Sequence, residues 1–420
     1  MTVFEEKDTP RFIAEAQMPG PTEVMPFLMV STFASWQDLA NWFIDLASPQ
    51  WKADDAIRAK VSELTKNISD PFEKLKKIHS FVVKNTRYVA LEFGIHGHKP
   101  YPVSQIFERR FGDCKDKASL LKVMLKEAGI ESEFVLARTR QNGDVSTDLA
   151  TPYLFDHAIL YVPQFDLFLD GTAEFSGTRE LPALDQDAWA LILRDDAHYT
   201  LRQIPVSKAS ENVTQLKYSV DLTDTESLKY TLAADYTGYF APSYRERYQI
   251  ENLQRERLES EIAYAIPGTK IDSFSMSDLT DLERDIHLDL NASISFTDIV
   301  KPDGNSWLVY PALAPSSMVR TFAPTASRKI PLILPVPLTF RKEVTLNLPK
   351  GAKAVLPDDI SEQSSFGSFS ISSRQSGDKI TTAASLALET IKISPEDYPA
   401  FIDFLQKYDR RMNSQYRITF

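Results

Sequence analysis

Cysteine is almost absent from this sequence: the only one in 420 residues is Cys114. A single thiol excludes an internal disulfide framework and any zinc site built from several cysteines. Cys114 is therefore either a small buried hydrophobe or a working thiol.

Long apolar runs and excess positive charge are also lacking. The best candidate for a membrane span, residues 330–340, is short and carries three prolines, whereas a spanning helix needs about 20 apolar residues. The 47 Lys and Arg against 58 Asp and Glu give a net charge of −11, which disfavours nucleic-acid binding because that binding depends on basic side chains. The start of the chain lacks the basic and apolar regions of a secretory signal, so export cannot be inferred from it.

The composition is otherwise typical of a folded protein, with 43% hydrophobic and 25% charged residues. A chain of 420 residues predicts two or three domains. Residues 1–34, rich in Pro and Met, indicate a lead-in, and residues 35–206 combine helical patterns with short strands. From about residue 207, after a small-polar stretch, period-two alternation predicts a β-rich region that extends to residue 420.

Local signals predict the elements of the middle segment. Asp70 followed by Pro71 caps a helix that runs to about Lys84, a short helix covers Val103 to Arg109, and a helix that is apolar on most sides begins at Cys114 and ends at Gly129. Strands follow at residues 133–139, 158–162 and 165–170. The β-rich region is expected to contain a hairpin over 216–236, a charged helix over 243–264, a hairpin turning at 376–378 and a short helix near 395–409.

The charged helix has two expected faces. Its apolar stripe is Ile250, Leu253, Leu258 and Ile262, and its Arg and Glu run from Arg245 to Glu261 is expected to be a solvated face with i,i+4 pairs.

The position of Cys114 suggests chemistry. A thiol attacks carbonyls as the thiolate, which is a minor form of a free thiol at neutral pH. The positive end of the helix that Cys114 begins would stabilise the thiolate, and so would a nearby histidine. His157 begins one strand and Asp170 closes the next, so an antiparallel pairing of these strands would bring the two side chains together. The carboxylate would hold one imidazole nitrogen while the other takes the thiol proton.

These residues also carry a family resemblance. The segment GDCKDKA at residues 112–118, Asp156-His157-Ala158 and Asp170-Gly171-Thr172 resemble the transglutaminase-like superfamily of papain-type cysteine enzymes. The likeness extends over about residues 36–193 and is closest to the bacterial branch in which this core follows an N-terminal β-sandwich of unknown function. It implies an α+β fold with helices packed on an antiparallel sheet, followed by a β-rich, sandwich-like accessory region. It further implies that residues 1–34 are what remains of the upstream sandwich.

The resemblance assigns the roles at the site. Cys114 is the expected nucleophile, His157 the general base and acid, and Asp170 the residue that orients His157. Gln105 and Tyr101 are both candidates for the side chain that helps the Cys114 backbone N–H bind the oxyanion. The expected reaction is acyl transfer on a protein or peptide substrate through a thioester, with hydrolysis and transamidation both open. No metal or organic cofactor is required.

Other interpretations of the sequence stay open. His96 and His98 invite a metal site, but no third ligand has a recognisable spacing, and a loop near the site is the simpler expectation. His79 falls on an apolar helix stripe and is expected to be a core histidine. The rival function is a catalytically silent scaffold of the bacterial cell envelope that binds a protein partner through its C-terminal region. The resemblance and the scarcity of thiols favour the periplasm or cell envelope over the cytosol.

Overall fold

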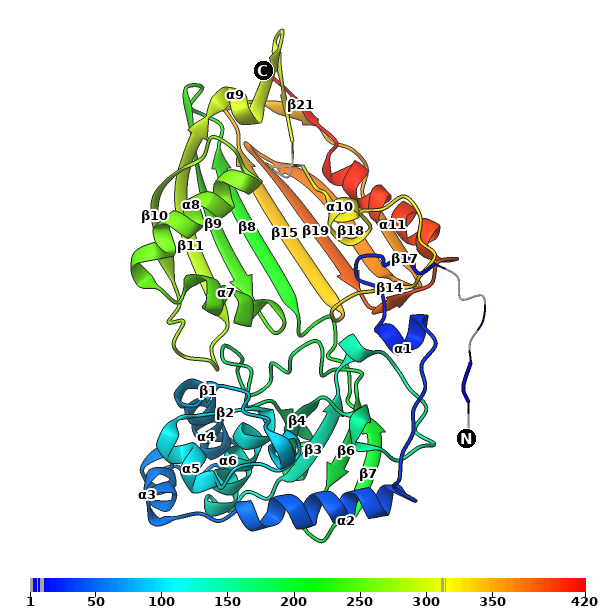
Figure 1. Ribbon diagram of the computed structural model, residues 1–420. Helices are drawn as coiled ribbons and strands as arrows, with labels where there is room; N and C mark the ends of the chain where they lie inside the picture. The colour runs from blue at the N-terminus through cyan, green and yellow to red at the C-terminus, as the bar shows by residue number, and fades with distance from the viewer. Residues whose placement is uncertain (1–2, 6, 8–10, 311–312, 314) are drawn as a thin grey trace.

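The structure, a computed structural model, describes residues 3–5, 7, 11–310, 313 and 315–420 (Figure 1). Residues 1–2, 6 and 8–10 of the expected lead-in and residues 311–312 and 314 of the β-rich region lie outside the described residues. Figure 1 shows a helix-rich core with a five-stranded sheet and a separate, larger sheet built from the second half of the chain. The α+β fold class predicted from the sequence is confirmed.

The helices of the core form where local capping signals predict them. They are α2 (Trp36–Ala47), α3 (Asp55–Leu64), α4 (Pro71–Asn85), α5 (Val103–Arg109) and α6 (Cys114–Glu127). Side chains of Ser35, Asp54, Asp70 and Asp113 cap α2, α3, α4 and α6 by accepting a hydrogen bond from a backbone N–H of the first turn. Helix α6 is buried continuously from Cys114 to Leu125, so it is the central helix of this half.

The core sheet is antiparallel throughout and packs against α6. Its strand order is β5-β4-β3-β6-β7, with β3 (Glu133–Arg138), β4 (His157–Val162), β5 (Leu167–Leu169), β6 (Trp189–Leu193) and β7 (Tyr199–Gln203). After α4, the short strand β1 (Arg87–Tyr88) pairs in parallel with β2 (Phe111–Gly112). That pairing places Tyr88 beside the start of α6.

The second half is organised around an eight-stranded sheet, with smaller sheets beside it. The strand order is β10-β11-β9-β8-β15-β19-β18-β17, and within this sheet the pairing of β8 with β15 is parallel while the others are antiparallel. The strands of this sheet are β8 (Val213–Asp221), β9 (Ser227–Tyr236), β10 (Lys270–Met276), β11 (Ile286–Ser295), β15 (Leu338–Asn347), β17 (Ile360–Ser364), β18 (Gly367–Ser376) and β19 (Lys379–Leu388). The smaller sheets are formed by β12 (Val300–Asp303), β13 (Ser306–Val309), β21 (Tyr416–Thr419) and β16 (Lys353–Val355), and by β14 (Leu332–Ile333) and β20 (Lys392–Ile393).

One face of the large sheet carries the core of this half. Alternate side chains such as Leu232, Leu288 and Val344 are buried, and helices α7 (Phe240–Tyr248), α8 (Gln254–Ala265) and α11 (Tyr398–Met412) cover them (Figure 1). The short helices α9 (Phe296–Ile299) and α10 (Met318–Phe322) complete the half. No helix in the described part of the chain has the length and hydropathy needed to cross a bilayer.

The expected single charged helix over 243–264 is wrong: the structure has two helices, α7 and α8. The chain is extended at Ile250, which is 44% exposed and does not belong to an apolar stripe, while Leu258 and Ile262 are buried as expected. Arg245 is also not on a solvated face, since it is 1% exposed. The break has a tertiary cause, because α7 buries Arg245 and Tyr248 whereas α8 buries Leu258 and Ile262. The last helix begins later than expected, at Tyr398, and runs to Met412.

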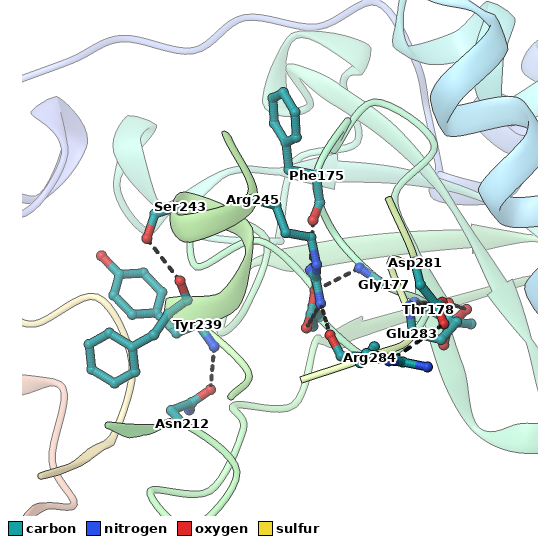
Figure 2. A network of polar contacts seen from close by, with 12 residues as sticks. Phe175, Gly177, Thr178, Asn212, Tyr239, Ser243, Arg245, Asp281, Glu283 and Arg284 are labelled. Atoms are coloured by element: carbon teal, nitrogen blue, oxygen red, sulfur yellow. Dashed lines mark hydrogen bonds and ion pairs between the residues drawn. The ribbon is translucent and has the colours of Figure 1, made fainter. Parts of the chain in front are cut away.

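Arg245 joins the two halves (Figure 2). Its guanidinium donates two hydrogen bonds to the Glu180 carboxylate, at 2.6 and 3.1 Å, and others to the carbonyls of Phe175 and Arg284, each at 2.8 Å. Nearby, the Thr178 backbone N–H donates to Glu283 at 2.9 Å. Glu180 and Thr178 lie between β5 and β6 of the core, so the β-rich half fixes a segment of the core.

The described part of the lead-in touches both halves. Thr22, in the short helix α1 (Pro21–Val24), donates to the Asn142 carbonyl at 2.9 Å, while the Gln17 carbonyl accepts from the Ile333 N–H at 2.8 Å. Glu15 forms an ion pair with the buried Arg328. The lead-in is therefore packed along the boundary of the two halves.

Replacing Arg245 with Ala should be severely destabilising, because it leaves the buried Glu180 carboxylate without a cation and with only the Gly177 N–H as a donor. Breaking a buried ion pair typically costs about 3 to 5 kcal/mol, so we expect a loss of that size in the apparent free energy of unfolding by urea. Arg247→Ala on the same helix removes an ion pair of an exposed side chain and should cost less than about 1 kcal/mol. Equal losses of unfolding free energy in the two variants would contradict a stabilising role of the Arg245–Glu180 ion pair.

Candidate active site

Cys114 is the first residue of α6, and the motif around it builds the helix start. Asp113 and Asp116 form a reciprocal capping box, in which each carboxylate accepts from the other residue's backbone N–H, at 3.2 and 3.4 Å. Gly112 is required by close approach, because a Cβ there would lie 2.6 Å from the Cβ of Asp116. The Gly-Asp-Cys sequence therefore places the thiol at the positive end of the central helix.

The charges that flank Cys114 neutralise one another. Lys115 Nζ lies 2.5 Å from an oxygen of Asp113, and Arg109 Nη2 lies 3.0 Å from an oxygen of Asp116. Both acids are buried, at 0% and 1% exposure. The flanking side chains therefore leave little net charge next to Cys114.

His157 is held at the first position of β4, opposite Ala137 of β3. The preceding residue, Asp156, anchors this strand end by accepting from the N–H and the hydroxyl of Thr139, at 2.7 and 2.5 Å. His157 keeps 14% of its side-chain surface exposed, whereas Cys114 is 9% exposed. Both residues are therefore largely buried.

Both carboxylate oxygens and the backbone carbonyl of Asp170 have polar partners. Its Oδ1 accepts from the N–H and the hydroxyl of Thr172, both at 2.7 Å, and its backbone carbonyl lies 3.3 Å from Nε2 of His79. The other carboxylate oxygen, Oδ2, lies 3.3 Å from Nε2 of His157. Thr172 therefore directs Asp170 so that one oxygen remains for the histidine.

The structure brings Cys114, His157 and Asp170 together. Burial opposes the charged imidazole, but the charge and hydrogen bond of Asp170 and a hydrogen bond with Cys114 outweigh it, so the pKa of His157 lies well above its usual value. Burial likewise opposes ionisation of Asp170, yet His157 and Thr172 lower the pKa of that carboxyl. The pair is therefore an imidazolium and a carboxylate at neutral pH. Because Nε2 faces Asp170, Nδ1 is the nitrogen left for the thiol.

Asp185 is a further acid at the site. One ligand atom from each of His157, Asp170 and Asp185 lies within 4.8 Å of the other two, and Asp185 is only 2% exposed. Burial and the charge of Asp170 raise the pKa of Asp185 to about 8. Asp185 is not among the site residues predicted from the sequence, because its position depends on β6, a strand that the sequence patterns did not predict.

The same three side chains are the one group of potential metal ligands in the described part of the chain. A metal would need the neutral imidazole, whereas Asp170 keeps His157 protonated. The donor set therefore fits a proton network better than a cation.

The candidate oxyanion donors occupy different positions. Gln105 is exposed on α5, and the Tyr101 hydroxyl donates to the Leu91 carbonyl at 3.4 Å. Tyr88 is not among the site residues predicted from the sequence. Burial and the negative charges of Cys114 and Asp113 raise its pKa to about 12. Because Tyr88 pairs with Gly112, two residues before Cys114, it is a third candidate donor, and it is 44% exposed.

The remaining histidines take structural positions. His79 is 2% exposed, in agreement with the expectation of a core histidine, and burial lowers its pKa. His96 stacks on Tyr101 with ring centroids 3.8 Å apart, and His98 packs edge-on against Trp42. A pocket of about 750 Å³ lies elsewhere, between the lead-in, the core and the β-rich half, and Cys114 does not line it.

Comparisons with known proteins agree with this architecture. Residues 58–180 match the transglutaminase-like superfamily, and residues 307–418 match a domain of unknown function, DUF3858. Among solved structures, the chain is similar to a proposed protease of Parabacteroides distasonis ATCC 8503, with a TM-score of 0.61 and 15% identity. The alignment covers 98% of this chain and 64% of that one, so this chain spans less than two thirds of its length. No curated protein matches. The family resemblance predicted from the sequence is confirmed for the core.

Asp170→Asn should lower the pKa of His157, because it removes the opposite charge and leaves burial dominant. Histidine ring resonances in NMR, assigned with His157→Gln, would measure it. Asp235→Asn is the matched control: it should lower the pKa of His287, which Asp235 raises, and leave His157 unchanged. Since the folded-state pKa of His157 is raised, its stabilising contribution should be complete below about pH 6.5 and disappear as pH rises through the raised value. A wild-type His157 that titrates below pH 6.5 would contradict the ion pair.

Proposed function

We propose that the transglutaminase-like core formed by residues 58–180 makes this protein a cysteine-dependent acyl-transfer enzyme acting on amide bonds of a protein or peptide. The observation that carries the proposal is the grouping at one site of Cys114, at a helix N-terminus, with His157, whose pKa Cys114 helps to raise and whose Nε2 lies 3.3 Å from Asp170. The likeness to a proposed protease is consistent with an amide substrate.

The geometry suggests how acylation would proceed. The Cys114 thiolate attacks the carbonyl carbon and forms a C–S bond, while the carbonyl π electrons move to the oxygen. When the intermediate collapses, the C–N bond breaks and His157 gives its proton to the leaving nitrogen. Asp170 keeps the imidazole in place throughout.

The second half of the reaction releases the acyl group. Water or an amine attacks the thioester, neutral His157 accepts the attacking group's proton, and the C–S bond breaks to restore the thiolate and imidazolium. Water gives hydrolysis and an amine gives transamidation, and the same three residues support both.

The oxyanion would be stabilised at the start of α6. The first N–H groups of a helix have no intrahelical partner, so the Cys114 backbone N–H is available as a donor. A side-chain donor would come from Tyr88, Tyr101 or Gln105. Tyr88 is favoured because it pairs with Gly112 just before Cys114, whereas Tyr101 already donates to Leu91.

Cys114→Ala should abolish turnover without unfolding the protein, and His157→Ala should reduce turnover by about 10² to 10⁴-fold. A panel of electrophilic peptide amide analogues should give a covalent adduct, which intact-mass and peptide mass spectrometry would locate on Cys114. Adding a primary amine to a substrate found in this way would separate transamidation from hydrolysis by the product mass. The rival function, a silent scaffold, predicts no adduct and a partner affinity that Cys114→Ala does not change.

The three candidate oxyanion donors can be ranked by substitution. Tyr88→Phe should lower kcat by about 10² to 10³-fold with little change in KM, since the lost hydrogen bond forms only in the transition state. Tyr101→Phe and Gln105→Ala should each change kcat less than tenfold. A larger loss in either of these two variants than in Tyr88→Phe would reassign the donor.

A further inference from the structure

The starting observation is a buried carboxyl group that the proposed reaction does not use. Asp185 follows a turn in which its N–H donates to the Pro182 carbonyl at 3.1 Å, and β6 begins soon after it. Its Oδ2 is buried and has no hydrogen-bond partner among the described residues. A buried, unpaired acceptor of this kind is costly, so the contact with Asp170 needs an explanation.

Topology explains why three acidic or basic side chains meet here. Strand β4 starts at His157, β5 ends just before Asp170, and β6 starts just after Asp185. In the antiparallel order β5-β4-β3-β6, these three strand ends lie at the same end of the sheet. The segment between Asp170 and Asp185 therefore leaves and rejoins the sheet beside His157.

Two carboxyl groups in contact cannot both be ionised without strong repulsion. Two ionised carboxylates also lack a donor, so their contact becomes a hydrogen bond only when one of them carries a proton. Asp170 faces the imidazolium of His157 and accepts two bonds from Thr172, which favour its charged form. The shared proton therefore belongs on Asp185, and burial together with the charge of Asp170 keeps it there up to a pKa of about 8.

The segment that carries Asp185 is rigidly held. Gln186 accepts from the N–H and hydroxyl of Ser207 at 2.8 and 2.9 Å, and the Leu184 carbonyl accepts from the N–H of Arg140 at 2.9 Å. Earlier in the same segment, Glu180 accepts two hydrogen bonds from Arg245. The residues on both sides of Asp185 are thus anchored, which keeps its backbone next to Asp170.

We propose that Asp185 is a positioning residue whose protonated carboxyl donates a hydrogen bond to Asp170 and holds that carboxylate against His157. This role rests on the proposed cysteine function. The charged groups that face Asp185 are Asp170, His157 and Asp156 on the core strands, together with Arg140 after β3. When Asp185 ionises, the hydrogen bond is lost and two like charges repel, so the Asp170–His157 contact weakens above about pH 8.

The test uses the rate at which iodoacetamide alkylates Cys114, measured by mass spectrometry from pH 5 to 10 on the full chain. Cys114 is the sole thiol, so the rate reports on this site and needs no substrate. Asp185→Asn keeps a donor and cannot ionise, Asp185→Ala removes the donor, and Asp187→Asn is the matched control on the same segment. Asp187 is half-buried and has a positive φ of 60°, which Asn tolerates.

The expected wild-type profile contains an ionisation near pH 8, with reactivity falling above it. Asp185→Asn should alkylate within about twofold of wild type at pH 6 and lose this ionisation, whereas Asp187→Asn should retain it. Asp185→Ala should be slowed roughly tenfold at pH 6, the effect of losing one hydrogen bond to a charged group.

Two results would overturn the role of Asp185: an unchanged ionisation near pH 8 in Asp185→Asn, or wild-type reactivity in Asp185→Ala. Should Asp185→Ala fail to fold, as judged by circular dichroism, the profile of Asp185→Asn decides alone. A different result would contradict the proposed function itself, namely wild-type Cys114 that reacts with iodoacetamide at pH 6 no faster than free cysteine.

Discussion

The contact between His157 and Asp170 is the interaction around which the site is arranged. It spans two neighbouring strands of one sheet, and each partner is fixed from behind, His157 by the Asp156–Thr139 anchor and Asp170 by Thr172. Because the contact keeps the imidazole charged, the thiol at the start of α6 has a cation beside it as well as a helix terminus. Pairing of the strands in this sheet therefore also brings His157 and Asp170 together.

The β-rich half contributes to this site without touching the thiol. Its Arg245 grips Glu180, and its Glu283 accepts from Thr178, both on the segment that begins with Asp170 and ends near Asp185. Such a segment has no regular secondary structure of its own, so its geometry depends on side-chain partners. The second half thus supports the geometry of the proposed active site, which gives a physical reason for the two halves to be joined in one chain.

Much of this could be predicted from the sequence where the signals are local. Asp70 and Pro71 predict α4, the Gly-Asp-Cys motif predicts the start of α6, and the short strands place His157 and Asp170 at neighbouring ends. Long-range pairing hid the rest. Asp185 depends on β6 joining β3, Tyr88 on a two-residue parallel pairing, and Arg245 on a partner that lies 65 residues earlier in the chain. An arginine in a run of charges gives no local sign that it will be buried.

The parallel pairing of β8 with β15 has a consequence for biosynthesis. The centre of the large sheet cannot form until residues 338–347 have left the ribosome, long after the core sequence has emerged. Until α7 docks, Glu180 is without its guanidinium and the segment that bears both acids is unsupported. We expect a nascent chain in which only the core has folded to lack this support, so the proposed site would reach its final geometry only after residues 338–347 have been added to the sheet.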